Sequence, residues 1–455
     1  MLKGEKIDER RSFTVKVLLI SPGKDEYYKK RLKLALKMPP LTLSTIAALT
    51  KPDIEVAILD EHVEPINYDD VPDLVGITVM TSVAPRAYKI ADKFRKSGAK
   101  VVLGGPHPSA LPKEAIRHCD AVVIGEAEGA WEKLLEDFKN GDLKQFYFNE
   151  KLPSLVNLPE PRRDLYKKEA YYFVNSLQVS RGCPFNCSFC SVSNFFGRTY
   201  RHRPIADVIR EIEHLEGKFV AFIDDNIVGN PKYSKELFNA LIPLKIRWVG
   251  QSSFNIIRDP DLLKAAKKSG CAGLFIGLET ISEESMQEIG KVQNDIKEFK
   301  VGIKRLHDHG IIVLGAFIFG FDSDDKDVFK RTLDFALESK LDLAQFSILT
   351  PLPGTRLYEK LSSEDRIINA DWSKYDMGNA VFMPAQMTPE ELQKGMGWAW
   401  REFYSYGSIL KRLFSVNFHL LRHLLYFAPL LVLNMSFKRA LDFESKMAKA
   451  SITKH

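Results

Sequence analysis

The sequence predicts an α/β protein made of two successive parallel sheets followed by a helical tail. Short apolar runs alternate with helix-like stretches from about residue 13 to 140, and the same alternation resumes between 177 and about 349. Short apolar strands that alternate with helices are typical of parallel sheets covered on both faces. After about residue 356 the alternation stops and the pattern becomes helical.

Composition sets the class of protein before any motif is considered. The chain has 455 residues, which suggests about three domains as a starting expectation. Its hydrophobic content of 45% is ordinary for a globular protein, and its net charge of +6 is spread along the chain. We therefore expect a folded protein without a nucleic-acid-binding stripe, and no nucleic-acid partner.

The first dozen residues are charged and lack the apolar core of a signal peptide. We expect them to form a frayed tail. Five cysteines in a chain of this length do not form the framework of a disulfide-stapled secreted domain. The cytoplasm is therefore the expected compartment.

The first block is expected to form a domain over residues 13–140. Its candidate strands are the apolar runs at 15–20, 54–59, 74–80, 101–103 and 121–124. Its candidate helices lie at 41–49, 86–97, 113–118 and 128–138. Two glycine-rich segments follow strands here, GGPHPS from Gly104 and GEAEG from Gly125. Parallel sheets bind ligands beyond such strand ends, although an ordinary turn explains either segment equally well.

Residues 141–175 are punctuated by proline and are expected to be a linker. The second block, residues 176–355, has candidate strands at 177–180, 219–223, 246–251, 273–278, 312–319 and 343–348. Its candidate helices lie at 205–215, 232–241, 260–269, 282–289, 296–309 and 326–338. Several of these strands end in acceptor side chains, notably Asp224, Asp225, Ser253 and Glu279. Such groups, gathered on one rim, can hold ammonium and hydroxyl groups of a ligand.

The stretch around which the second block is organised is Cys183-Pro-Phe-Asn-Cys187-Ser-Phe-Cys190. Three cysteines with CxxxCxxC spacing can surround one centre. Small buried side chains are one alternative, and a zinc site is another, but zinc needs a fourth ligand and the nearest histidine is His202. The favoured interpretation is an iron–sulfur cluster, which normally has four thiolate ligands and would here keep one iron open.

With Phe189 before the last cysteine and Arg181-Gly182 before the first, this motif resembles that of the radical S-adenosylmethionine (SAM) superfamily. The resemblance implies a partial (β/α)6 barrel and a [4Fe-4S] cluster held by Cys183, Cys187 and Cys190. It also implies that the open iron binds SAM and that one electron cleaves SAM to a 5′-deoxyadenosyl radical. On the same basis, SAM contacts are expected from Phe189, Asp224, Ser253 and Glu279, with Asp225 as an alternative to Asp224.

A leading α/β domain with these glycine-rich segments resembles the Rossmann-like cobalamin-binding domain of B12-dependent radical SAM proteins. The resemblance implies a cobalamin site, whose expected residues are Thr78, Gly104, Gly105, Pro106, His107, Gly125 and Glu126. The sequence departs from other B12 proteins in one respect. The segment after the first strand, SPGKDEYYKK, lacks the DxHxxG histidine, so no histidine from that loop is expected on cobalt. His107 follows the fourth strand instead and is interpreted as a pocket or turn residue.

The tail, residues 356–455, contains a clear helix start at Thr388-Pro389-Glu390-Glu391. The helix that follows carries Trp398, Trp400, Phe403 and Tyr404, which suit an apolar substrate or an ordinary core equally well. This extension resembles that of a subgroup containing hopanoid and bacteriochlorophyll C-methylating enzymes. Residues 409–437 are apolar with basic residues at their borders, but the longest uncharged run is too short to span a bilayer. A peripheral membrane helix and a helix packed on the barrel both remain open.

The predicted function is a cobalamin-dependent radical SAM enzyme, a C-methyltransferase that methylates an unactivated carbon of an apolar small-molecule substrate. It would need an external one-electron reductant such as flavodoxin or ferredoxin. One alternative keeps the architecture but catalyses a non-methylating cyclisation or coupling. A radical SAM methylthiotransferase would need further cysteines in the first domain, where only Cys119 is present. A non-catalytic cluster- or corrinoid-binding protein is the last alternative, and the intact cysteine motif disfavours it.

Overall fold

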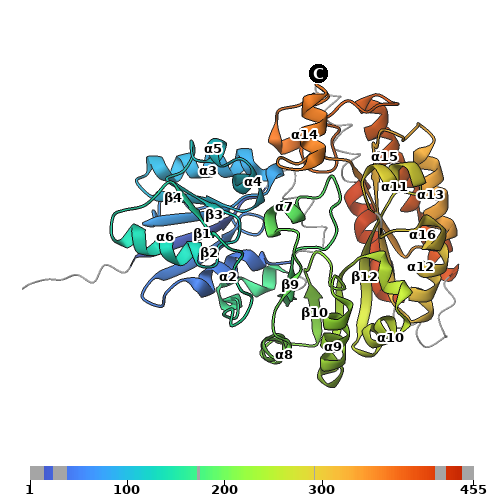
Figure 1. Ribbon diagram of the computed structural model, residues 1–455, viewed down its shortest axis with the longest axis horizontal. Helices are drawn as coiled ribbons and strands as arrows, with labels where there is room; N and C mark the ends of the chain where they lie inside the picture. Colours follow the sequence, from blue (N-terminus) through green and yellow to red (C-terminus); the bar gives the residue numbers. More distant parts are fainter. Residues whose placement is uncertain (1–14, 24–37, 172–174, 292, 416–426, 443–455) are drawn as a thin grey trace, which may run out of the picture.

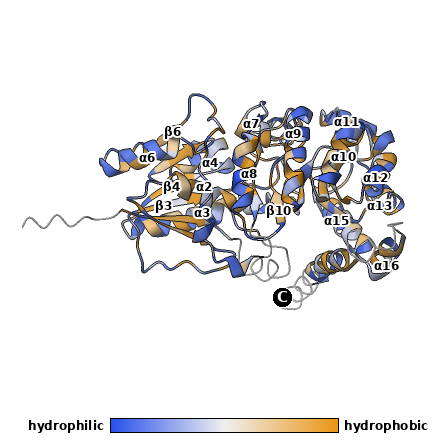
Figure 2. Ribbon diagram, turned by 90° about the horizontal axis from the view of Figure 1, so that it is seen from below, coloured by the Kyte–Doolittle hydropathy of each residue, from blue (hydrophilic) through white to orange (hydrophobic). Residues whose placement is uncertain are grey.

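The computed structural model describes residues 15–23, 38–171, 175–291, 293–415 and 427–442. Two six-stranded parallel sheets lie side by side, the first on the left of Figure 1 and the second toward the right. The strand orders are β2-β1-β3-β4-β5-β6 and β14-β13-β12-β11-β10-β7. Figure 2 shows apolar residues concentrated on the strands and on the helix faces turned toward them. The predicted α/β class with two parallel sheets is confirmed.

The first sheet comprises β1 (Lys16–Ser21), β2 (Glu55–Asp60), β3 (Leu74–Thr78), β4 (Lys100–Gly104), β5 (Ala121–Ile124) and β6 (Phe146–Phe148). All of its pairings are parallel. Strand β6 lies beyond residue 140, where the sequence predicted the domain to end. It was missed because this three-residue edge strand has one buried side chain, Tyr147, between two exposed phenylalanines.

Helices cover both faces of the first sheet. Helix α3 (Ala84–Lys96) packs on one face through a core that includes Phe94, and α2 (Leu41–Leu49) and α6 (Ala130–Lys139) pack on the other around Trp131. Two short helices, α4 (Pro106–Ala110) and α5 (Pro112–Ala115), follow β4. Because helices cover both faces of the sheet, the central strands are continuous apolar runs in the sequence.

The second sheet comprises β7 (Ser176–Leu177), β10 (Phe219–Phe222), β11 (Arg247–Ser252), β12 (Cys271–Glu279), β13 (Ile312–Phe319) and β14 (Leu343–Ile348). Its edge strands β7 and β14 are not paired with each other, so the barrel is open. The intervening helices are α8 (Ile205–Glu213), α9 (Pro231–Leu241), α10 (Pro260–Lys268), α11 (Glu283–Glu288), α12 (Phe299–Asp308) and α13 (Val328–Glu338). This arrangement confirms the predicted partial barrel, in which the carboxyl ends of the strands form the functional rim.

A two-stranded antiparallel ribbon stands apart from both sheets. Strands β8 (Ser180–Arg181) and β9 (Arg201–His202) form it, and they bracket the segment that contains the three motif cysteines and α7 (Val192–Phe196). We refer to residues 182–200 as the cysteine loop. The ribbon therefore fixes both ends of this loop at one place.

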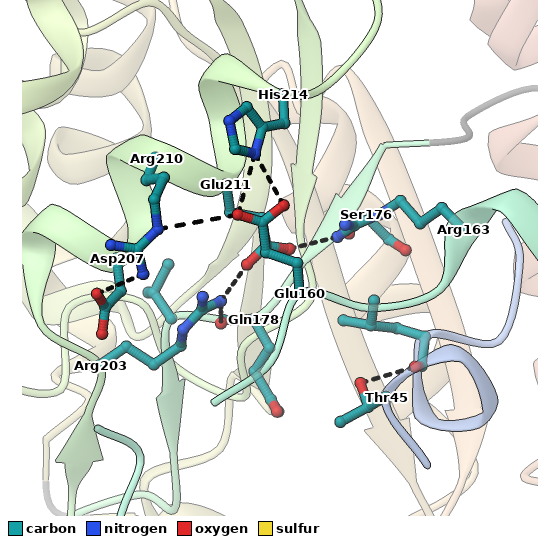
Figure 3. Close-up of polar contacts among 12 residues, drawn as sticks. Thr45, Glu160, Arg163, Ser176, Gln178, Arg203, Asp207, Arg210, Glu211 and His214 are labelled. Carbon is teal, nitrogen blue, oxygen red and sulfur yellow. Dashed lines mark hydrogen bonds and ion pairs between the residues drawn. The ribbon is translucent and has the colours of Figure 1, made fainter. Parts of the chain in front are cut away.

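The linker is held to the barrel by buried charge. Arg163, from the short turn Arg163–Leu165, donates to the Ser176 carbonyl and pairs with Glu211 of α8 at 2.5 Å. Arg203 pairs with the other oxygen of Glu211, also at 2.5 Å. Figure 3 shows both arginines converging on Glu211. Arg163 thus ties its part of the linker to α8.

The tail packs against the outside of the barrel. Helix α15 (Pro389–Phe403) starts as predicted, because the Thr388 side chain accepts from the Glu391 backbone N–H in a capping box. Trp400 donates to the Phe346 carbonyl at 2.7 Å, and buried Tyr404 donates to the Ala344 carbonyl at 2.9 Å. Of the two interpretations offered by the sequence, the structure supports a core role for these aromatic side chains.

The tail begins with α14 (Arg356–Ser363). Its end contains α16 (Tyr406–Ser415) and helical residues 427–442. Buried Arg412 donates to the Asp342 carbonyl at 2.6 Å and to Asn434 at 2.9 Å, which joins both helices to the residue just before β14. Residues 416–426 of the apolar segment 409–437 lie outside the described part of the chain. Among the described helices, none is long and apolar enough to cross a membrane.

Candidate active site

The three motif cysteines line one cavity at the carboxyl ends of the barrel strands. Cys183, Cys187 and Cys190 contribute to its wall, and the cavity volume is about 290 Å³. The loop begins with Gly182 at φ +86°, and a Cβ on this residue would lie 2.0 Å from the Thr199 carbonyl oxygen. Only glycine allows the loop to close on itself this tightly. We call this space the cysteine cavity.

The cysteines do not converge on a point as the ligands of a single ion would. No group of three or more His, Cys, Asp or Glu in the described residues could hold one metal ion. Each thiolate of an iron–sulfur cube binds a different iron, so the thiolates stand further apart than those of a zinc site. Burial raises the pKa of Cys183 and Cys187, and raises that of Cys190 to about 12. Three cysteines in CxxxCxxC spacing around one cavity suit a multi-iron cluster that keeps one iron open.

Glu279 and Lys291 form a buried ion pair on the wall of the cysteine cavity. Glu279 ends β12 with φ +67°, a left-handed backbone that is unusual for a side chain of this size. Lys291 also donates to the Gly277 carbonyl at 2.9 Å. Such strain in a cavity wall is typical of functional sites.

The two predicted aspartates have separate environments. Asp224 is buried and accepts from the Val179 N–H at 3.1 Å and from the Ser180 N–H and hydroxyl at 2.5 Å, and it does not line the cavity. Asp225 does line it. Its buried Oδ2 has no hydrogen-bond partner among the described residues, and burial raises its pKa to about 6. Asp224 is therefore a structural anchor of the first barrel strands, and Asp225 is available to a ligand.

Phe189, Ser253 and Glu279, all predicted from the sequence, line the cysteine cavity. Asn226 accepts from the Ser253 backbone N–H at 3.0 Å, and its Nδ2 is left without a partner. The cavity also includes Lys291, Gln293 and Gln345, which the sequence interpretation missed. Unpartnered buried atoms on Asp225, Asn226 and Gln293 fit a polar ligand with both donors and acceptors, such as the amino-acid and ribose parts of SAM.

A second cavity, of about 160 Å³, lies between the first sheet and the barrel, and we call it the interdomain cavity. Its walls include Thr78, Gly104, Gly105, Gly125 and Glu126, five of the residues predicted from the sequence. Apolar side chains such as those of Leu19 and Val123 line it too. Glycine backbone at the strand ends and an apolar wall fit a large, flat ligand such as a corrin.

Pro106 and His107 are not among the residues lining the interdomain cavity. The His107 side chain is buried inside the first domain, where its Nε2 lies 3.0 Å from the Tyr88 hydroxyl and 3.3 Å from Glu114. Its ring packs edge-on against Trp372 of the tail. The described cavity walls contain no histidine, and residues 24–37 of the first-strand loop lie outside the described part of the chain.

Helix α7 separates the two cavities. Val192, at its start, lines the cysteine cavity, whereas Phe195 and Phe196 line the interdomain cavity. The loop after β10 also contributes to both cavities: Ile223 lines the interdomain cavity, and Asp225 lines the cysteine cavity. The two cavities are therefore neighbours.

Comparison with known proteins agrees with this division. Residues 31–135 match the B12 binding domain, and residues 177–336 match the Radical SAM superfamily. Bacteriochlorophyllide d C-12(1)-methyltransferase of Chlorobaculum tepidum is 33% identical over 82% of this chain and 84% of its own length. The chain belongs to the B12-binding radical SAM enzymes. The family, fold class, enzyme class and cofactor set predicted from the sequence are thereby confirmed.

Two more B12-binding or tetrapyrrole-related proteins are similar at greater distance. The anaerobic magnesium-protoporphyrin IX monomethyl ester cyclase of Rubrivivax gelatinosus is 25% identical over 88% of this chain and 79% of its own. The structure of the radical SAM methyltransferase TsrM from Kitasatospora setae, with cobalamin and a [4Fe-4S] cluster bound, superposes with a TM-score of 0.67. That match covers 85% of this chain and 88% of TsrM at 16% identity, so it supports the fold of this radical SAM enzyme.

Proposed function

We propose that this enzyme transfers a methyl group to an unactivated carbon of an apolar small-molecule substrate. The observation that carries the proposal is the pair of neighbouring cavities that share α7 and the loop after β10. The C. tepidum relative, which is named as a bacteriochlorophyllide d methyltransferase, supports methyl transfer to a large ring system. The apolar walls of both cavities support an apolar substrate.

The same proposal assigns roles to residues. Cys183, Cys187 and Cys190 would hold the [4Fe-4S] cluster. SAM would be held by Phe189, Ser253, Glu279 and Asp225, with Asp225 taking the place first expected for Asp224. Cobalamin would lie against Thr78, Gly104, Gly105, Gly125 and Glu126, while Pro106 and His107 shape the domain beneath it. When bound, the cluster supplies the electron that cleaves SAM, and cobalamin carries the methyl group.

The chain's own residues position these partners and exclude water. Phe195 and Phe196 form an apolar wall beside the interdomain cavity, and Phe189 and Phe185 do so beside the cysteine cavity. Apolar walls protect a carbon radical from water and stray hydrogen donors. We propose the domain limits 13–148, 149–175, 176–355 and 356–455, with the first limit moved from residue 140 because β6 belongs to the first sheet.

The test is anaerobic reconstitution with iron, sulfide and hydroxocobalamin, followed by desalting and an absorption spectrum. Retained corrinoid and iron–sulfur absorbance are expected. SAM with a trideuterated methyl group is then supplied with tetrapyrrole and polycyclic lipid candidates. The proposal requires 5′-deoxyadenosine and a product heavier by one labelled methyl group, and it fails if no corrinoid is retained.

A second candidate is a radical cyclisation without methyl transfer. The similarity to the R. gelatinosus cyclase favours it, because that protein spans nearly the whole of this chain. The labelled methyl group separates the two functions. A product that lacks the label, formed together with 5′-deoxyadenosine, would support cyclisation.

The proposed partners are an external one-electron reductant, such as flavodoxin or ferredoxin, and a membrane surface. On α16, Tyr406, Leu410 and Phe414 are 58%, 51% and 69% exposed. Their i, i+4, i+8 spacing places them on one face of the helix, beside the face that carries buried Ile409 and Leu413. An apolar stripe of this kind beside exposed Lys411 suits the interface of an anionic membrane. The thiol-ligated cluster suits a reducing compartment, so we propose the cytoplasm.

A further inference from the structure

Two arginines face each other at the base of the cysteine loop. Strands β8 and β9 pair so that Arg181 lies directly opposite Arg201. Arg181 immediately precedes the loop and Arg201 immediately follows it. Like charges in directly opposed positions of an antiparallel pair destabilise it. The ribbon that closes the cysteine loop therefore needs nearby negative charge.

That charge comes from the first domain. Arg181 Nη1 lies 2.5 Å from Glu126 Oε2, and Arg181 Nη2 lies 2.5 Å from Glu128 Oε1. Arg201 pairs with the remaining oxygen of Glu126 and also donates to Glu126 Oε2 at 3.3 Å. We call these four side chains the interdomain ion cluster. Glu126 alone thus contacts both ends of the cysteine loop.

The cluster is shielded from water, and within it Arg181 and Glu128 each stabilise the charged form of the other. The exposed fractions of the Arg181, Glu126 and Glu128 side chains are 11%, 2% and 9%. Burial alone would lower the pKa of Arg181, but Glu128 and Glu126 raise it. Burial alone would raise the pKa of Glu128, but Arg181 lowers it. Two positive and two negative groups balance, so the loss of one carboxylate would leave a buried charge uncompensated.

Other contacts keep the first domain docked without this cluster. Tyr171 of the linker donates to Asp60 at 3.0 Å, and the Arg162 N–H donates to the Ser44 carbonyl at 2.9 Å. Trp372 of the tail donates to Glu114 at 3.0 Å. None of these contacts touches the cysteine loop. The interdomain ion cluster is distinct because its first-domain carboxylates bind Arg181 and Arg201, the two residues that flank the loop.

The same carboxylates also form part of the interdomain cavity. Glu126, Glu128 and Arg181 line it together. The Gly125–Gly129 segment therefore contacts whatever occupies that cavity on one side and fixes the cysteine loop on the other. A shift of this segment would change the spacing between the two cavities.

We propose that Glu126 and Glu128 are positioning residues that set the cysteine loop relative to the interdomain cavity through Arg181 and Arg201. Their role is to hold the site of radical formation and the site of methyl transfer at a fixed distance from each other. They take no part in the bond changes. The inference rests on the proposed function for its catalytic consequence. Its structural consequence is independent of any cofactor.

The first test uses hydrogen exchange on the cofactor-free protein. Glu126→Gln keeps the shape of the side chain and removes its charge. We expect amide exchange in residues 182–200 to accelerate by about tenfold, whereas residues 271–279 of β12 keep the wild-type rate. Arg331→Gln, which breaks an exposed ion pair with Asp325, is the matched control and should change neither segment. Unchanged exchange in the cysteine loop would overturn the proposal.

The second test measures coupling in the reconstituted enzyme, as the ratio of 5′-deoxyadenosine formed to methyl groups transferred. Glu126→Gln is expected to raise this ratio by about fivefold or more, because misplacement by about an ångström can cost two orders of magnitude in rate. If Glu126→Gln does not fold, Glu128→Gln and Arg181→Lys serve instead. Arg181→Lys keeps the positive charge, so it should retain more of the wild-type coupling than Glu128→Gln does. A wild-type protein that forms no 5′-deoxyadenosine would refute the proposed function but not the exchange result. Normal coupling in all three variants would refute the positioning role.

Discussion

Glu279 reaches Lys291 only because its own backbone adopts a left-handed conformation at the end of β12. The register between β12 and β13 shifts at this point, between Gly277 and Glu279. A Cβ at Gly277 would lie 2.2 Å from Glu279 Oε1 and 2.7 Å from Lys291 Nζ. Glycine at 277, the bulge and the buried lysine therefore act together to place one carboxylate in the cysteine cavity.

The first prediction concerns that carboxylate. Glu279→Gln should weaken SAM binding by about tenfold or more, because a hydrogen bond to a charged group contributes about 1.5–3 kcal/mol. Equilibrium dialysis of reconstituted protein with labelled SAM measures the change. Glu283→Gln, whose side chain is 65% exposed on α11, is the control and should bind as the wild type does. Equal affinity in Glu279→Gln and the wild type would remove Glu279 from the SAM site.

A second prediction separates the neighbouring aspartates. Asp224→Asn should lower the free energy of unfolding by about 1–3 kcal/mol, because an amide cannot accept all the bonds that Val179 and Ser180 donate. Asp225→Asn should leave stability near the wild-type value and weaken SAM binding instead. Urea unfolding of cofactor-free protein and SAM dialysis, performed on both variants, give the comparison. The opposite pattern would restore Asp224 as the ligand-facing residue.

The third prediction is a pH dependence at Asp324. This buried carboxyl accepts from the Gly320 N–H at 2.8 Å and the Phe321 N–H at 3.1 Å, and burial raises its pKa to about 6. The folded pKa lies above the unfolded value, so ionisation is harder in the folded state and stability is gained as pH falls through 6. Between pH 7.5 and 5 the wild type should gain roughly 1 kcal/mol relative to Asp324→Asn.

Urea midpoints of the wild type and Asp324→Asn at the two pH values provide the measurement. Asp325→Asn is the matched control, because exposed Arg331 holds the pKa of Asp325 below its usual range. The prediction is wrong if the difference in the free energy of unfolding between the wild type and Asp324→Asn is the same at both pH values.

The fourth prediction tests the apolar stripe on α16. The double variant Leu410→Glu, Phe414→Glu should abolish co-sedimentation with vesicles that contain anionic lipid, since both side chains point away from the barrel core. Stability should stay close to that of the wild type for the same reason. Exposed Val301 on α12 provides a control position for the same charge change, Val301→Glu. If the wild type itself remains in the supernatant, the stripe does not bind membranes.

Sequence alone predicted most strands because the sheets are parallel and helices cover their faces. The run at 121–124 matches β5, and 343–348 matches β14, residue for residue. Strand β5 is apolar on both faces, and its ends are marked by Asp120 and Gly125. Strand β6 escaped because an edge strand buries only one face, and three residues are too few to show an alternation.

The site could be predicted only where a local pattern carries it. The CxxxCxxC spacing alone indicates a shared cluster, so all three cysteines could be assigned to one site, and they line one cavity in the structure. Asp224 and Asp225 are adjacent at a strand end, and which of them faces the cavity depends on the barrel's curvature. Lys291 and Gln293 lie in irregular chain after α11, and Glu126 reaches Arg181 from 55 positions away. Contacts of that kind leave no local signature.

The two cysteines outside the motif have a practical consequence for handling the protein. Cys119 and Cys271 are buried, whereas Cys183, Cys187 and Cys190 are partly exposed. Thiols enclosed in the interior react slowly with alkylating agents and disulfide reagents, which cannot reach them. Labelling of the native protein under argon should therefore count the motif cysteines alone. The stoichiometry of modification becomes a direct gauge of how much of a preparation carries its cluster.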